Sequence, residues 1–220
     1  ADCERVRTVG YEGEGEREMM HSQETAWTLA LASASAYNPQ ALNIGDSLCL
    51  AEISRRGDQV IIAFQGTDSG DDWISNIETK QTATPIGCIH SGFWKTINKW
   101  FGDILVAANI GTLDQVWVTG HSRGGAHATI FAALCKMRQI QIAGCYTFGS
   151  PRVGDKDFAR WCNKNIVHHR YVYQSDIVTR LPRIGYKHTG KLHWHDGSEW
   201  RLHTPWWTRL GAFLFARRWP

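Results

Sequence analysis

The sequence predicts an α/β fold in which a mainly parallel sheet is covered by helices on both faces. Short β-branched runs alternate with helical segments along most of the chain. The 220 residues are 43% hydrophobic and 20% charged, which is typical of a globular protein large enough for a packed core. No linker or internal repeat interrupts this pattern, so we expect a single domain over residues 1–220.

The N-terminal third of the chain predicts an arm, a helix and two strands. Residues 1–20 are charged and dotted with glycine, so we expect a surface arm. Residues 23–37 are rich in alanine and place apolar side chains at helical spacing, which predicts a helix. Residues 48–54 and 59–65 read as strands joined by a turn that contains Gly-Asp.

The remaining elements alternate as the fold class requires. Residues 93–108 give the clearest helix, because their aromatic and aliphatic side chains recur on one face and predict core packing. After it we expect a strand over 115–119, a helix over 125–138, a strand over 142–148, a helix over 156–164 and a strand over 166–173.

Charge is divided unevenly along the chain. Residues 1–150 carry 11 basic and 16 acidic side chains, whereas residues 151–220 carry 13 basic and 5 acidic ones. Five of the 11 tryptophans lie within the last 27 residues, where no carboxylate follows Glu199. Tryptophan with arginine indicates contact with an anionic membrane surface by the basic, Trp-rich segment 200–220, and no nucleic-acid partner. The alternative is a helix packed on the body of the domain.

The composition argues against a membrane-spanning segment and a metal site, and the start of the chain concerns its location. The longest near-apolar stretch, 210–216, is far shorter than the roughly 20 residues that cross a bilayer. The six cysteines form no C-x-x-C pair, which excludes a zinc knuckle and favours buried free thiols over disulfides. His193 and His195 with His203 could bind zinc, but an exposed strand is favoured and we expect no metal. The missing initiator Met indicates a processed or trimmed start, which hardly constrains the location; a secreted or peripheral membrane protein is favoured.

The run Gly120-His121-Ser122-Arg123-Gly124 fits G-x-S-x-G. It lies between a predicted strand and a predicted helix, which is the context of a nucleophile elbow. Glycines are needed there because the serine adopts a strained backbone conformation in which neighbouring Cβ atoms would clash. The alternative is a glycine-rich turn with an ordinary serine.

Five further runs accompany the elbow. In chain order, the six are F-Q-G-T (64–67), D-W-I-S-N (72–76), H-S-G-F (90–93), G-H-S-R-G-G (120–125), T-F-G-S-P-R-V-G (147–154) and D-I-V-T-R-L-P (176–182). Together they resemble, in order, the motifs of the class 3 lipase family, whose best-known members are fungal triacylglycerol lipases with the α/β-hydrolase fold. The resemblance covers residues 64–182, about half of the chain.

The resemblance implies a set of catalytic residues. Ser122 would be the nucleophile, Asp176 the acid that orients the base, and the backbone N–H groups of Thr67 and Arg123 the oxyanion hole. Each oxyanion donor is worth roughly 3 kcal/mol in the transition state. Asp176 could instead be a cap or turn residue. Arg123 departs from the family, in which an apolar residue is usual; we expect its side chain to form a salt bridge at the rim or to meet a lipid headgroup.

The segment between Thr67 and His90 would carry the family's lid. Asp71 and Asp72 open an amphipathic stretch with Trp73, Ile74 and Ile77 on one side. Such an apolar face would cover the serine in water and open at a lipid surface. A fixed surface helix is the alternative.

The general base is the least determined part of the site. The chain order Ser, Asp, His requires a histidine after Asp176, which leaves His188, His193, His195 and His203. In bacterial sequences resembling this one, a Trp- and Arg-bearing helix like residues 205–219 precedes a short stretch that supplies the base. We therefore place the base beyond Pro220 first and at His203 second. His188 follows, although it resembles a family histidine that is not the base, and His193 or His195 comes last.

These observations predict a carboxylic ester hydrolase that cleaves acyl lipids through an acyl-enzyme, without a cofactor. One alternative is a lipid-binding relative that has lost the base. Another is a phospholipase A1 or thioesterase-type hydrolase. The sequence does not distinguish between lipid classes.

Overall fold

The computed structural model describes residues 12–38, 43–46, 49–67 and 79–202. Its centre is an eight-stranded sheet in the order β1-β2-β3-β6-β7-β8-β9-β10. The strands are β1 (Asn43–Asp46), β2 (Cys49–Arg56), β3 (Gln59–Phe64), β6 (Gln115–His121), β7 (Gly144–Phe148), β8 (His168–Tyr173), β9 (Lys191–His195) and β10 (Trp200–Arg201). From β3 to β9 all neighbours are parallel, while β1, β2 and β10 add antiparallel edges. The prediction of a mainly parallel sheet is confirmed.

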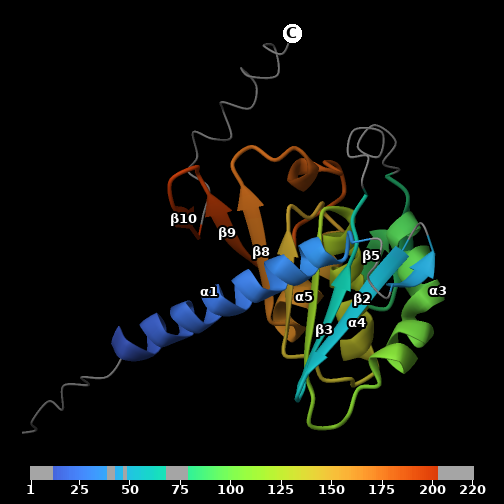
Figure 1. The fold of residues 1–220 in the computed structure, drawn as a ribbon. Helices are drawn as coiled ribbons and strands as arrows, with labels where there is room; N and C mark the ends of the chain where they lie inside the picture. Colours follow the sequence, from blue (N-terminus) through green and yellow to red (C-terminus); the bar gives the residue numbers. More distant parts are fainter. Residues whose placement is uncertain (1–11, 39–42, 47–48, 68–78, 203–220) are drawn as a thin grey trace, which may run out of the picture.

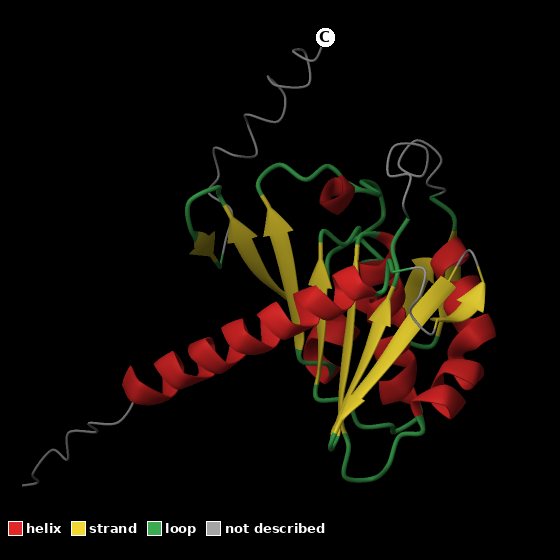
Figure 2. Ribbon diagram, in the orientation of Figure 1, coloured by secondary structure: helices red, strands yellow, loops and turns green. Residues whose placement is uncertain are grey.

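Helices cover both faces of this sheet (Figures 1 and 2). Helix α1 (Glu12–Ser35) crosses one face, over β6 and β3. Helices α3 (Ser91–Ala108), α4 (Arg123–Met137) and α5 (Lys156–Asn165) lie on the opposite face. Every residue of α4 from Gly124 to Cys135 is buried, so this part of the helix has no exposed polar face; the polar His127 and Thr129 are buried among apolar and small residues.

Two apolar clusters hold the layers together. The larger one joins β2, β3 and β6 to α3, α4 and α5, and includes the fully buried rings of Phe64, Phe131 and Phe158. The smaller one lies under α1, where Ala26 and Leu29 contact Tyr146 and Tyr171. The aromatic stripe predicted on the helix over 93–108 contributes Phe93, Ile97, Phe101 and Ile104 to the larger cluster.

The structure corrects several predicted boundaries. Helix α1 begins at Glu12, so the second half of the segment expected as a surface arm is helical. The Glu, Arg and Met residues in that half favour helix and outweigh its isolated glycines. The short strand β1 and the hairpin of β4 (Gln81–Thr84) and β5 (Gly87–His90) were not predicted. Strands of four residues show too little alternation to stand out in sequence.

The cysteines agree with the prediction of free thiols wherever they are described. Cys49, Cys135, Cys145 and Cys162 are buried and unbonded to one another, and Cys88 is partly buried. Burial raises the pKa of Cys49 and Cys135 to about 12, so both remain protonated and unreactive. Within the described ranges no helix is long and apolar enough to span a membrane, and no group of His, Cys, Asp and Glu could hold a metal ion.

Candidate active site

Ser122 lies at the sharp turn where β6 ends and α4 begins. Its backbone adopts φ 54° and ψ −125°, a conformation that costs a non-glycine residue about 1–3 kcal/mol. Its N–H donates to the Phe148 carbonyl at 2.9 Å, which ties the turn to the end of β7. A Cβ on Gly120 or Gly124 would overlap neighbouring backbone, so the flanking glycines are sterically required. The side chain is half-buried at the positive end of the α4 dipole.

Thr67 lies beside this turn, three residues after β3 ends. Phe64 pairs with Gly120 in the parallel ladder, and the backbone around Gly124 packs directly against Phe64 and Gln65. The hydroxyl oxygen of Thr67 is buried and has no hydrogen-bond partner among the described residues. This leaves a polar group near the elbow that a substrate oxygen could satisfy.

Asp176 follows β8 in a tight turn at the same edge of the sheet. One carboxylate oxygen, Oδ1, accepts the Val178 N–H at 3.0 Å, and the backbone carbonyl accepts the Thr179 hydroxyl at 2.8 Å. The other oxygen, Oδ2, faces Gly149 so closely that a Cβ there would lie 2.7 Å away. Burial raises the pKa of Asp176, while the Val178 amide and nearby His121 act in the opposite direction.

His121 lies near Asp176 and contacts Tyr37, which sequence reasoning missed. Its Nε2 and Asp176 Oδ2 both lie near the position that a Cβ on Gly149 would occupy, at 3.5 Å and 2.7 Å. Its Nδ1 forms a 3.0 Å hydrogen bond with the hydroxyl of Tyr37, just after α1. Although part of the ring is exposed, burial of the remainder lowers the pKa of His121, and Asp176 opposes that shift. In the sequence, only its place in the G-x-S-x-G run drew attention to His121. It cannot be the base of the predicted chain order, because it precedes Asp176.

The described histidines after Asp176 are engaged elsewhere. His188 donates from Nε2 to the Thr179 carbonyl at 2.6 Å, and burial lowers its pKa to about 3. His193 is hydrogen-bonded through Nε2 to Nδ1 of His169 at 2.8 Å, and His195 accepts the Gly197 N–H at 3.0 Å. Among the described residues, no hydrogen bond therefore joins one of these three rings to Ser122 or Asp176.

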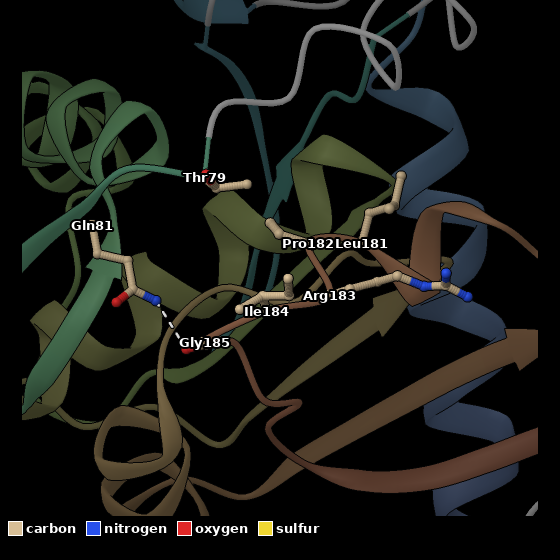
Figure 3. Close-up of a pocket in the computed structure, with 7 residues that line it drawn as sticks. All are labelled: Thr79, Gln81, Leu181, Pro182, Arg183, Ile184 and Gly185. Carbon is tan, nitrogen blue, oxygen red and sulfur yellow. Dashed lines mark hydrogen bonds between the residues drawn. The ribbon is translucent and has the colours of Figure 1, made fainter.

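A pocket of about 490 Å³ opens beyond the acid loop (Figure 3). The apolar side chains of Leu181, Pro182 and Ile184 line it, and Ile184 is 88% exposed. Across the opening, the Gln81 side-chain amide donates to the Gly185 carbonyl at 3.0 Å. Thr79, Gln81, Arg183 and Gly185 complete the lining, so the apolar side chains are accompanied by polar groups and one cation.

Three predicted features lie outside the described residues. These are the lid stretch with Trp73, Ile74 and Ile77, the candidate base His203, and the basic, Trp-rich segment beyond Leu202. The predicted lid, the candidate base His203 and the predicted membrane-contacting segment are therefore not tested by the structure and stay predictions. Arg123 can be placed: its guanidinium donates to the Gly66 carbonyl at 3.3 Å, a partner that neither the rim nor the headgroup interpretation anticipated.

Comparisons with known proteins find similar chains in one family. The model of the family described as Lipase (class 3) matches residues 61–186. A secreted mono- and diacylglycerol lipase of Fusarium solani is 33% identical over 150 residues, which are 64% of this chain and 45% of that protein. The solved lipase of Rhizopus microsporus var. chinensis superimposes with a TM-score of 0.71 at 24% identity, over 82% of this chain and 76% of that one.

A second solved structure shows the same fold, with an identity slightly higher than that of the Rhizopus lipase. The triacylglyceride lipase of Rhizomucor miehei superimposes with a TM-score of 0.69 at 25% identity, over 81% of each chain. The chain spans about half the length of the first curated relatives it matches, which it covers to 45% and 57%.

Proposed function

Because this chain belongs to the class 3 lipase family, we propose that it hydrolyses carboxylic esters of acyl lipids through an acyl-enzyme on Ser122. The observation that carries the proposal is the backbone of Ser122, held at φ 54° between two sterically required glycines. Such strain persists only where the surrounding structure enforces it, and it lifts the hydroxyl out of the sheet toward a substrate.

The reaction proceeds in two acyl transfers. Ser122 Oγ attacks the ester carbonyl while a histidine base takes its proton, and the carbonyl electron pair moves onto the oxygen. The backbone N–H groups of Thr67 and Arg123 stabilise this oxyanion. Collapse expels the alcohol, which takes the proton from the base. Water, deprotonated by the same base, then attacks the acyl-enzyme and releases the fatty acid and Ser122.

Asp176 serves as the acid that orients the base and stabilises its charged form. Its Oδ1 is engaged by the Val178 amide, so Oδ2 is the oxygen offered to an imidazole N–H. The identity of this base stays as the sequence ranks it, beyond Pro220 first and His203 second, and the substitution described below distinguishes the two.

The substrates we propose are acylglycerols. The Fusarium solani relative is named a secreted mono- and diacylglycerol lipase, which supports both this substrate class and a secreted location.

Contact of residues 200–220 with an anionic membrane belongs to the same proposal. Sedimentation with anionic vesicles tests that contact, since equal binding to neutral vesicles would contradict it.

A fluorophosphonate probe tests the nucleophile. The protein is expected to form a covalent phosphonyl adduct on the peptide that contains Ser122, and Ser122→Ala is expected to abolish it. Ser175→Ala is the matched control, because Ser175 is an exposed serine at the same edge of the sheet. Labelling that persists in Ser122→Ala would refute the assignment.

Substitution of His203 tests the origin of the base. If the base follows Pro220, His203→Gln in the natural protein is expected to leave the rate of labelling and of ester turnover within about twofold of the parent. Loss of about 10⁴ or more in turnover, the size expected for a triad member, would instead identify His203 as the base.

A further inference from the structure

The side chain of Arg123 contacts the peptide unit that carries an oxyanion donor. Its guanidinium donates to the Gly66 carbonyl at 3.3 Å. The carbonyl of Gly66 and the N–H of Thr67 belong to one planar peptide group, in which they point in opposite directions. A donor fixed on the carbonyl side therefore determines where the Thr67 N–H points.

We propose that the Arg123 side chain is a positioning residue that orients and polarises the Gly66–Thr67 peptide for oxyanion binding. This inference rests on the proposed function and deepens it. Arg123 then acts twice: its backbone N–H is one oxyanion donor, and its side chain sets the direction of the other. The family usually has an apolar residue at this position, which could not form this hydrogen bond.

The surroundings leave the peptide little freedom to turn. Gly66 packs so tightly against the Tyr37 hydroxyl that a Cβ would overlap it, and that Cβ would also lie 2.7 Å from the His121 carbonyl. One residue earlier, the Gln65 N–H donates to the Leu50 carbonyl at 2.9 Å. The backbone on the N-terminal side of the Gly66–Thr67 peptide is therefore confined, and the Arg123 hydrogen bond holds the carbonyl of that peptide.

The charge of Arg123 strengthens the effect. Hydrogen bonds from a charged donor are roughly twice as strong as neutral ones, and a polarised carbonyl makes the N–H of the same peptide a better donor. The guanidinium lies partly inside the protein, where its Nε atom is buried. Burial and, secondarily, the Arg123 charge lower the pKa of His127 to about 3. This position favours a role inside the site over contact with a lipid headgroup.

Three substitutions separate orientation from charge. Arg123→Leu restores the residue type usual in the family and removes the hydrogen bond. Arg123→Gln keeps a neutral donor, whereas Arg160→Leu removes an exposed arginine of α5 as a control for net charge. We expect Arg123→Leu to lower kcat about 10- to 100-fold with little change in KM, somewhat less than the roughly 10²–10³ for loss of a whole donor. Arg123→Gln is expected to recover part of the loss, and Arg160→Leu to change nothing.

A readout without turnover distinguishes this inference from the proposed function. The amide ¹H and ¹⁵N resonances of Thr67 are expected to move upfield in Arg123→Leu and less in Arg123→Gln, in folded protein at one pH. If these shifts occur but esters are not hydrolysed, the orientation stands and the proposed function fails. Unchanged Thr67 resonances in Arg123→Gln and Arg123→Leu, or a kcat equal to the parent in an active enzyme, would overturn the inference. Should Arg123→Leu fail to fold, the Arg123→Gln shift alone decides.

Discussion

The carboxyl of Asp176, the residue proposed to orient the base, lowers the stability of the folded protein at neutral pH. This carboxyl is partly buried, and burial raises its pKa although the Val178 amide and His121 favour the ionised form. A carboxyl with a raised pKa binds its proton more tightly in the folded state than in the unfolded one. Folding stability therefore falls as pH rises from the unfolded pKa through the folded pKa, and the penalty is fully present above both.

Replacement of this carboxylate is expected to stabilise the protein. Asp176→Asn keeps an oxygen for the Val178 N–H but removes the buried charge, so the free energy of unfolding at pH 7 should increase. At about pH 3, below the ordinary carboxyl pKa, the gain should vanish because the parent is then protonated. Activity should fall about 10⁴-fold, as for loss of the orienting acid in other serine hydrolases. Denaturant titrations at both pH values check this, and an equal gain at the acidic pH would contradict it.

At the scale of elements, the turns after β7 and β8 meet at Gly149. This residue has φ 58°, and a Cβ on it would lie 2.7 Å from Asp176 Oδ2 and 3.5 Å from His121 Nε2. Glycine is therefore required at position 149 of the T-F-G-S-P-R-V-G run for two reasons. The backbone is left-handed there, and a side chain would collide with the Asp176 carboxylate.

A pair of glycine substitutions separates these two requirements. Gly149→Ala should lower the free energy of unfolding by about 1–3 kcal/mol for the backbone alone and also displace Asp176, so that activity falls. Gly57→Ala is the matched control: Gly57 has φ 61° in the turn between β2 and β3, and a Cβ added there would meet no other atom within 4 Å. It should lose similar stability and keep its activity. Equal activities in the two variants would show that Gly149 does not position the acid.

The elements also show where sequence reasoning works and where it stops. The strand before Ser122 and the helix after it follow from local composition, because β-branched residues favour strands and small ones permit a buried helix. The β4–β5 hairpin has strands of four residues, too short for a periodic signal. The Tyr37–His121 contact joins residues 84 positions apart, and no local pattern encodes such a distance.

For the whole molecule, the parallel sheet brings the candidate groups to one edge. Thr67 follows β3, Ser122 follows β6, and Asp176 follows β8, so all three lie at the carboxyl ends of parallel strands. The order of the motifs along the sequence predicted this arrangement, because the motifs lie in loops that follow parallel strands and such loops meet at one edge of the sheet. The contact of the Arg123 side chain with the Gly66 carbonyl could not be predicted, since it depends on how closely α4 and the end of β3 pack.

The rate of ester turnover decides whether Ser122 is the nucleophile of an ester hydrolase. The initial rate of hydrolysis of a short-chain p-nitrophenyl ester would be measured for the natural protein, Ser122→Ala and the Ser175→Ala control. If Ser122 is the nucleophile, Ser122→Ala loses about 10⁶ in rate, down to the background of the assay, while Ser175→Ala equals the parent. Undiminished hydrolysis by folded Ser122→Ala would show that another group attacks the ester.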